Sequence, residues 1–256
     1  MRPTKKAGTL AYFLGIILIA AVIQLAGLAK HDRLVFPGIG EILRTFVRLL
    51  GTSHTYTLML TTLRHLLAVL AVSTAAGVGL GLLEGMIPFV RRLLAPLMVF
   101  LRSIPMIVLV VVIMVLTRYD RVPLIASSLV LIPMISEATC EGVLRIDREL
   151  VDVYRLCSGL TPYILWKVYL PLMAGYMKQA YINAAGMGIK MVVSTEYLVQ
   201  TRNSLGKAIY SSSYFNEYAE IYAYALIMIL LVLALTELPL WVGRKVEAMR
   251  EKQYGK

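Results

Sequence analysis

Long apolar runs separated by short polar stretches dominate the hydropathy pattern of this chain. Residues 7–29 carry no charged side chain, and neither do residues 66–83. A helix needs about 20 mostly apolar residues to cross the hydrocarbon core of a bilayer. The pattern therefore predicts an all-α polytopic membrane protein with about six transmembrane helices. The predicted spans are residues 9–29, 58–83, 93–117, 121–141, 170–197 and 219–243.

The polar stretch between the first two predicted spans is amphipathic. In "FPGIGEILRTFVRLL" (residues 36–50) charged and apolar positions separate onto opposite sides of a helix. The charged side carries Glu41, Arg44 and Arg48, and the apolar side carries Ile42, Phe46 and Leu49. This pattern is typical of a helix at a membrane surface, and equally of a short amphipathic connector.

Residues 142–169, between the fourth and fifth predicted spans, carry a run of start and stop signals. Residues 149–157 have the pattern of a short helix, and Gly159 favours its end. Thr161-Pro162 supplies an N-cap and a first-turn proline for a second helix, before Leu170-Pro171 changes the direction of the chain. This helix-turn-helix suits a docking element that transmits force, and an ordinary well-capped loop has the same signals.

Composition supports a membrane protein and changes how the net charge is interpreted. Hydrophobic residues make up 59% of the chain and charged residues 16%, against about a quarter charged in soluble domains. A net charge of +11 would suggest nucleic-acid binding in a soluble protein, but here Lys and Arg flank the apolar runs. With a cytoplasmic N-terminus, the inner segments hold 14 Lys and Arg residues and the outer segments 8. The charge bias predicts that both termini and the 142–169 loop are cytoplasmic.

No catalytic or metal-binding motif occurs in the sequence. Cys140 and Cys157 belong to no CxxC pair and no Cys/His cluster. The "LGK" at 205–207 lacks the upstream glycine of a phosphate loop, and neither GxSxG nor HExxH occurs. We therefore expect no enzymatic activity, no metal and no cofactor bound by this chain.

Cations inside predicted spans are candidates for a solute path. Arg102, Lys178 and Lys190 would each cost about 2.5–3.5 kcal/mol at the bilayer centre if they faced lipid. Arg102 best fits a packing role. Lys178 is close enough to the cytoplasmic end of its predicted span for its side chain to snorkel to the membrane surface. Lys190 is the best path candidate, although a structural ion pair or snorkelling would also accommodate it. The predicted path residues are Met187, Lys190, Met191 and Glu196.

Small residues recur every four positions in the second predicted span, at Ser73, Gly77, Gly81 and Gly85. This spacing places them on one helix face, where they let another helix backbone approach closely. The spacing favours packing within the chain over a dimer seam.

Several of these segments together resemble one family of transporters. The loop ending in Leu170-Pro171 resembles the EAA loop of binding-protein-dependent ABC importer permeases; its acidic position falls on Asp152 and its glycine position on Ser158, beside Gly159. Four further segments resemble the nitrate/sulfonate/taurine type of this family. They are "FPGIGEIL" (36–43), "FLRSIPMIVLVVVIMV" (100–115), "EGVLRIDRELVDVYRLCSG" (141–159) and "STEYLVQTRNSLGKAI" (194–209).

The resemblance implies a type I ABC importer permease-like bundle in the bacterial cytoplasmic (inner) membrane. It implies an N-terminal span and outer amphipathic segment over residues 1–57, and a permease core over 58–250 with the coupling loop at 142–169. The implied partners are cytoplasmic ABC ATPases that use ATP and Mg, a second permease subunit, an extracytoplasmic solute-binding protein and the lipid bilayer, without nucleic acid. The implied ATPase-coupling residues are Asp152, Val153, Tyr154, Arg155, Leu156, Ser158, Gly159 and Tyr163.

Two other classes of membrane protein are alternatives to the permease. A secondary transporter would be expected to show inverted repeats or a chain of acidic groups for proton coupling, and the sequence shows neither. A membrane scaffold would explain the small-residue faces but not the loop. The sequence leaves open the solute, homodimer or heterodimer pairing, the activity of an EAA loop without its alanines, and whether Lys190 contacts substrate.

Overall fold

The computed structural model describes residues 37–146, 167 and 169–254, and every regular element in this part of the chain is helical. The elements are α2 (Ile39–Leu50), α3 (Ser53–Met86), α4 (Pro88–Ser103), α5 (Met106–Leu116), η1 (Tyr119–Arg121), α6 (Val122–Leu144), α9 (Leu170–Val199), α10 (Leu205–Tyr214) and α11 (Tyr218–Tyr254).

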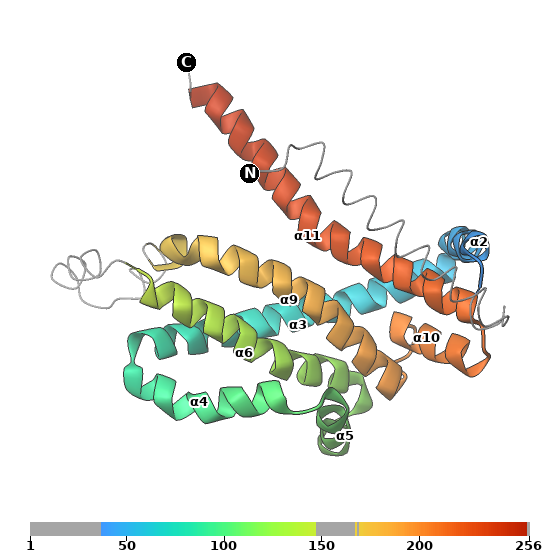
Figure 1. Cartoon of the computed structure of the whole chain (residues 1–256), viewed down its shortest axis with the longest axis horizontal. Coiled ribbons are helices and arrows are strands. Elements are labelled where there is room, and N and C mark those ends of the chain that lie inside the picture. The colour runs from blue at the N-terminus through green and yellow to red at the C-terminus, as the bar shows by residue number, and fades with distance from the viewer. Residues whose placement is uncertain (1–36, 147–166, 168, 255–256) are drawn as a thin grey trace, which may run out of the picture.

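Helices α3, α6 and α9 lie side by side and form the centre of the bundle (Figure 1). Leu66 of α3, Leu131 of α6 and Val192 of α9 are fully buried in one shared cluster. α11 packs against α9 and adds Ile227 to this cluster. Between membrane helices, association depends on such close packing more than on the hydrophobic effect, because lipid is as apolar as the side chains.

The glycine face of α3 packs directly against α6. A Cβ atom added at Gly77 would lie 2.8 Å from the Ile135 Cβ, and one at Gly85 would lie 2.6 Å from the Val143 Cβ. Both separations are too short for real Cβ contacts, so the two backbones approach closely only because these side chains are absent. The prediction that the small residues serve packing within the chain is confirmed.

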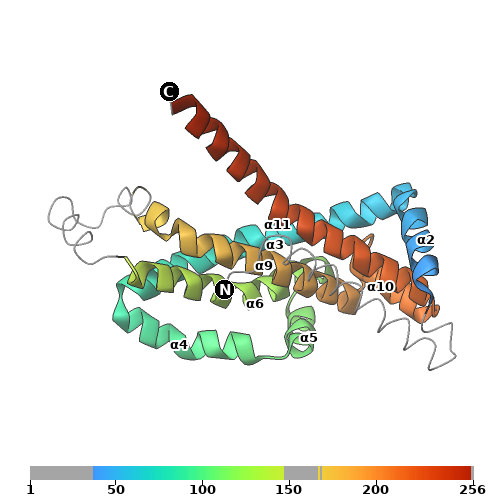
Figure 2. The ribbon, with the colours of Figure 1, turned by 45° about the horizontal axis from the view of Figure 1, so that its top comes forward.

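The single span predicted over 93–117 is wrong in one respect, because the structure divides it into α4 and α5. The two helix axes are bent by 103° at this break (Figure 2). Ile104 and Pro105 are both extended, with ψ of 127° and 133°. Proline lacks a backbone N–H and disfavours helical geometry in the residue before it, so the helix ends there.

The amphipathic segment forms α2, with Ile42 and Leu49 buried and packed toward the bundle. On its charged side, Arg48 pairs with Glu220 of α11 at 2.9 Å. The predicted helix is confirmed, and its contacts with α3 and α11 make it a packed part of the fold. A position at the membrane surface stays a prediction.

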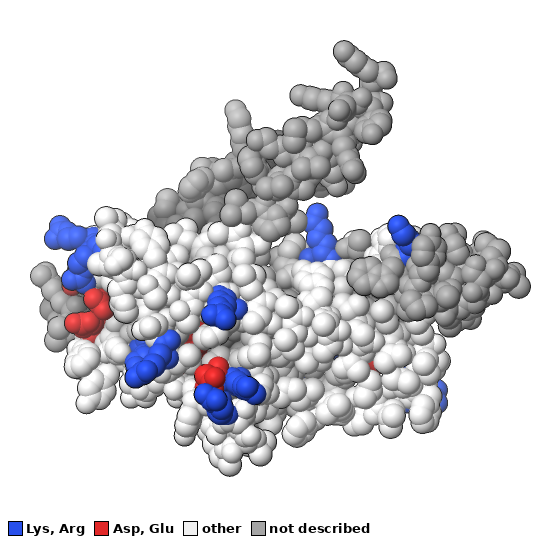
Figure 3. Space-filling model, turned by 180° about the vertical axis from the view of Figure 1, so that it is seen from behind, with Lys and Arg blue, Asp and Glu red and all other residues white. Residues whose placement is uncertain are grey.

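Three helical segments of the described chain are long and apolar enough to cross a membrane, Ser53–Met86, Tyr119–Leu144 and Tyr218–Thr236, with a fourth if α4 and α5 form one bent span. α9 is 30 residues long but carries Lys178, Lys190 and Glu196. One face of the molecule bears only scattered charged side chains (Figure 3). The polytopic all-α fold is confirmed; the predicted span 9–29 lies outside the described residues, and the division at residue 57 stays a prediction.

Candidate functional site

A groove of about 530 Å³ runs between α9 and α11. Its walls are almost entirely apolar, with Ile189 and Val193 on α9 facing Met228 and Val232 on α11. Ligand sites in proteins are typically concave, mostly apolar and supplied with a few placed polar groups. This groove has that composition, and Lys190 is the one charged residue among those that line it.

Lys190 is exposed on α9, and no ion pair joins it to any residue that the structure describes. Of the other predicted path residues, Met187 is also exposed and Met191 is half-buried, each close to Lys190 along the helix. Within the described residues, Lys190 therefore has the free charge that a solute-binding cation needs. The sequence predicted Lys190 as a path residue from the free-energy cost of a cation inside a membrane span.

Glu196 occupies a different environment from Lys190. Its side chain is completely buried, and both carboxylate oxygens accept hydrogen bonds. Thr62 Oγ1 donates to Oε2 at 2.8 Å, the Gly206 backbone N–H donates to Oε2 at 3.2 Å, and His65 Nδ1 lies 2.7 Å from Oε1. Glu196 does not line the groove; it joins α3, α9 and the start of α10.

The turn between α9 and α10 brings these partners together. Gln200 adopts the left-handed conformation, with φ of 55°, and ends α9. Ser204 then caps α10 by accepting a hydrogen bond from the Lys207 N–H at 3.2 Å. A Cβ at Gly206 would overlap the Glu196 Cβ and come within 2.5 Å of the Tyr197 nitrogen, so only glycine fits.

Sequence reasoning did not identify Thr62 and His65 as the partners of Glu196. They lie 134 and 131 residues away from it along the chain, and nothing in a local pattern links them. The one available signal was in "STEYLVQTRNSLGKAI" (194–209), where Glu196 precedes a Ser-Leu-Gly sequence, but Glu196 was predicted as a path residue instead.

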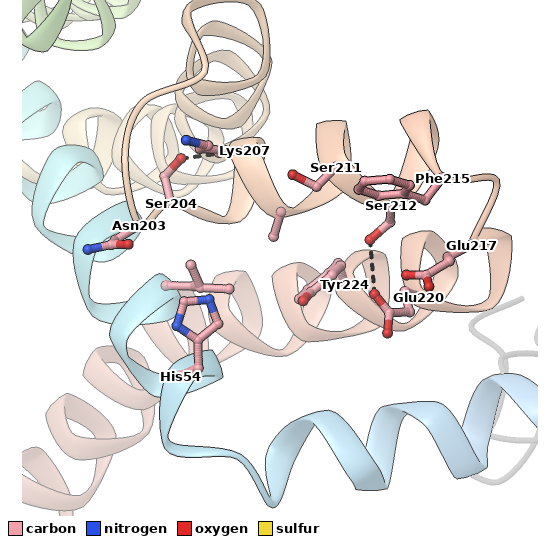
Figure 4. A pocket seen from close by; sticks show the side chains of 12 residues that line it. His54, Asn203, Ser204, Lys207, Ser211, Ser212, Phe215, Glu217, Glu220 and Tyr224 are labelled. Carbon is pink, nitrogen blue, oxygen red and sulfur yellow. Dashed lines mark hydrogen bonds between the residues drawn. The ribbon is translucent and has the colours of Figure 1, made fainter.

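A second hollow, of about 240 Å³, lies between α3, α10 and the start of α11 (Figure 4). Its lining mixes polar and apolar side chains, and the polar ones include His54, Ser212, Glu217 and Glu220. Ser212 Oγ donates to Glu220 at 3.0 Å, while the other oxygen of Glu220 pairs with Arg48. The negative charge of Glu220 raises the pKa of the nearby Glu217 carboxyl. α10 forms one wall of this hollow.

Two further cations of the predicted spans lie away from the groove. Arg102, at the end of α4, pairs with Glu137 of α6 at 2.7 Å, and both side chains are about half exposed. This contact agrees with a packing role. Lys178 is exposed on α9, in the half of the helix nearer Leu170.

The predicted ATPase-coupling residues, Asp152 to Tyr163, lie outside the described residues. The helices on either side of them are described. α6 ends at Leu144 and α9 begins at Leu170, and the two pack along each other. A load on the 142–169 loop would therefore act on two helices of the bundle's centre.

Several helices of membrane-crossing length packed into one bundle define an integral membrane protein. Residues 77–248 match the model of the family described as binding-protein-dependent transport system inner membrane component. The chain belongs to this family.

The chain is also similar to curated relatives and to a solved structure. It is 25% identical over 198 residues to a probable ABC transporter permease protein of Brucella melitensis, covering 75% of this chain and 80% of that protein. A probable ABC transporter permease protein of Brucella abortus is also 25% identical, over 75% and 78% of the two chains. A chain from a structure titled as inward facing conformations of the MetNI methionine ABC transporter matches with a TM-score of 0.56. That match has 22% identity and covers 76% of this chain and 97% of the other.

These comparisons confirm the coarser predictions. The chain is a multi-pass inner-membrane permease subunit of an ABC importer, with a fold like that of the matched chain of the MetNI methionine ABC transporter structure. The family is the membrane component of such systems and not the ATPase. The family match therefore excludes the two alternative interpretations, a secondary transporter and a membrane scaffold.

Proposed function

We propose that this permease belongs to the nitrate/sulfonate/taurine type and forms half of a path for an anionic solute. A second permease subunit, the same chain or a paralogue, supplies the other half. Two cytoplasmic ATPases bind the 142–169 loops and hydrolyse ATP with Mg, and an extracytoplasmic binding protein delivers the solute. The observation that carries the solute class is Lys190, a single cation on the wall of an otherwise apolar groove.

The physical argument for an anion rests on the cost of that cation. A lysine without a partner in a membrane protein costs about 2.5–3.5 kcal/mol at the bilayer centre, so its retention favours contact with water or an opposite charge. Among the described residues, the groove offers no carboxylate to balance Lys190. An anionic group on the solute, with an apolar part along Val193 and Met228, complements both features of the groove.

Substitution of Lys190 tests the path directly. We expect Lys190→Met to raise the KM for uptake about ten- to hundredfold, since a hydrogen bond to a charged group contributes roughly 1.5–3 kcal/mol. Lys190→Arg keeps the charge and should retain most of the uptake. The measurement is uptake of labelled nitrate, taurine and bicarbonate into proteoliposomes holding the complete transporter. Lys178→Met removes an equally exposed lysine of the same helix and should change nothing. Unchanged kinetics of Lys190→Met would assign Lys190 a structural role.

The partner assignment is tested by co-purification. A tagged chain extracted in mild detergent should retain an ABC ATPase and a second permease subunit, each identified by mass spectrometry. Because the family is defined by dependence on a binding protein, adding that protein with its solute should stimulate ATP hydrolysis by the purified complex. A chain that purifies alone and supports no stimulated hydrolysis would contradict the proposed assembly.

The proposed orientation has both termini in the cytoplasm. It rests on the excess of Lys and Arg, 14 against 8, in the segments placed inside. We expect terminal tags to resist protease added to right-side-out vesicles and to be cleaved once the vesicles are opened. Cleavage of either tag in intact vesicles would reverse the orientation, and with it the cytoplasmic position of the loop.

A further inference from the structure

The short helix α10 is attached to the bundle by a buried polar network at its first turn. Thr62 Oγ1 donates to Glu196 and at the same time accepts from the Leu205 backbone N–H at 3.0 Å. The next N–H of α10, that of Gly206, donates to the same Glu196 oxygen. Two backbone donors that a helix start leaves without intrahelical partners are thus bound by α3 and α9.

This hydrogen-bond network joins three elements, α3, α9 and α10, and so does more than cap the first turn of α10. A buried carboxylate is costly unless donors surround it, and the donors here come from two other elements, α3 and α10. His65 supplies the third contact, and its side chain is 24% exposed while that of Glu196 is 0% exposed. Removing the carboxylate would break the Gly206 bond to α9 and leave the Thr62 hydroxyl without its acceptor, so that the Leu205 N–H bond to Thr62 alone would remain of this network.

α10 also connects two functional features of the chain. It joins the end of α9 to the start of α11, the two helices that wall the Lys190 groove. Ser211 and Ser212 of α10, with its N-cap Ser204, line the hollow beside α11 (Figure 4). The placement of α10 therefore determines the shape of that hollow.

We infer that Glu196 is a positioning residue of the transport cycle: through Thr62 and Gly206 it holds α10 to α3 and α9, so that α10 moves with them when the path changes its facing. This role in transport rests on the proposed function. The attachment of α10 rests on the hydrogen bonds alone, and it is tested separately.

Matched substitutions separate the network from general packing. Thr62→Val keeps the shape of the side chain and removes the hydroxyl, whereas Thr62→Ser keeps the hydroxyl. Glu196→Met keeps a side chain of similar length but removes both oxygens, whereas the amide oxygen of a glutamine could still accept from both Thr62 and Gly206. If hydrogen bonding positions α10, the valine and methionine variants should fail and the serine variant should behave as wild type.

The measurement is the distance between α3 and α10, by double electron–electron resonance on the full chain in nanodiscs. Spin labels are placed at the exposed positions Tyr56 of α3 and Tyr214 of α10, after replacement of Cys140 and Cys157. A control pair joins Tyr56 to the exposed Tyr119, at the start of the α6 segment, and reports the bundle without α10.

We expect one narrow α3–α10 distance in the wild type and in Thr62→Ser, and a broadened or shifted one in Thr62→Val and Glu196→Met, with the control pair unchanged throughout. Uptake should fall in the same two variants and recover in Thr62→Ser. An unchanged α3–α10 distance in both variants would overturn the inference. So would a change of both label pairs together, because the network would then hold the whole fold. If no variant, including the wild type, transports any solute, the proposed function fails while the distances still decide the attachment.

Discussion

Gly81→Ala should sharply lower the yield and thermal stability of the folded permease, whereas Gly79→Ala, in the same helix, should leave both unchanged. A Cβ at position 81 would overlap the backbone oxygen of Ser136 and lie 2.5 Å from the Thr139 Cβ. A backbone atom cannot move aside as a flexible side chain does, so α3 and α6 would have to separate. Gly79 has nothing within 4 Å of the corresponding position.

The two substitutions are chemically identical, which isolates the effect of the helix contact. Overpacking of a tight contact costs about 1–3 kcal/mol, a large share of a total stability of about 5–15 kcal/mol. Alanine in a helix gains up to about 1 kcal/mol over glycine, so Gly79→Ala should be neutral or slightly stabilising. Fluorescence-detected size-exclusion chromatography after a temperature series measures both variants. Equal midpoints would mean that α3 and α6 are not in close contact in the membrane.

Tyr154→Ala should insert normally into the membrane but fail to retain the ATPase and to support stimulated ATP hydrolysis. Interface energy concentrates in a few aromatic and arginine side chains, and Tyr154 and Arg155 are the residues of that kind in the predicted first helix of the loop. Loss of one such anchor costs about 2 kcal/mol or more, which weakens binding about thirtyfold. Because the loop lies between two packed helices, its loss should uncouple the transporter without unfolding it.

The control for this experiment is Thr161→Ala in the same loop. Thr161 has the pattern of an N-cap, and its loss costs about 1 kcal/mol of helix stability without removing a contact surface. ATPase retention and solute-stimulated hydrolysis, measured side by side, should rank Thr161→Ala well above Tyr154→Ala. Full binding and full stimulation by Tyr154→Ala would show that this loop is not the coupling element.

The sequence by itself determined the class of the chain and most of its helices. Apolar runs of span length predicted α3, α6, α9 and α11, because a bilayer permits only helices or closed barrels and sets their minimum length. The period of small residues on α3 predicted a close helix contact within the chain. Lys190 could be predicted as a path residue because the free-energy cost of a cation inside a span follows from that one residue and its position in the sequence.

Only the tertiary structure decided which elements meet. The sequence predicted one span over 93–117, whereas the structure breaks it at Ile104-Pro105 and bends it by 103°, with α4 and α5 both packed on α6. Glu196 and Lys190 are six residues apart on one helix and looked alike as path residues. Their opposite environments depend on Thr62, His65 and Gly206, which come from separate elements. Local patterns report what a residue costs in the membrane, whereas two of the partners of Glu196, Thr62 and His65, lie more than a hundred residues away along the chain.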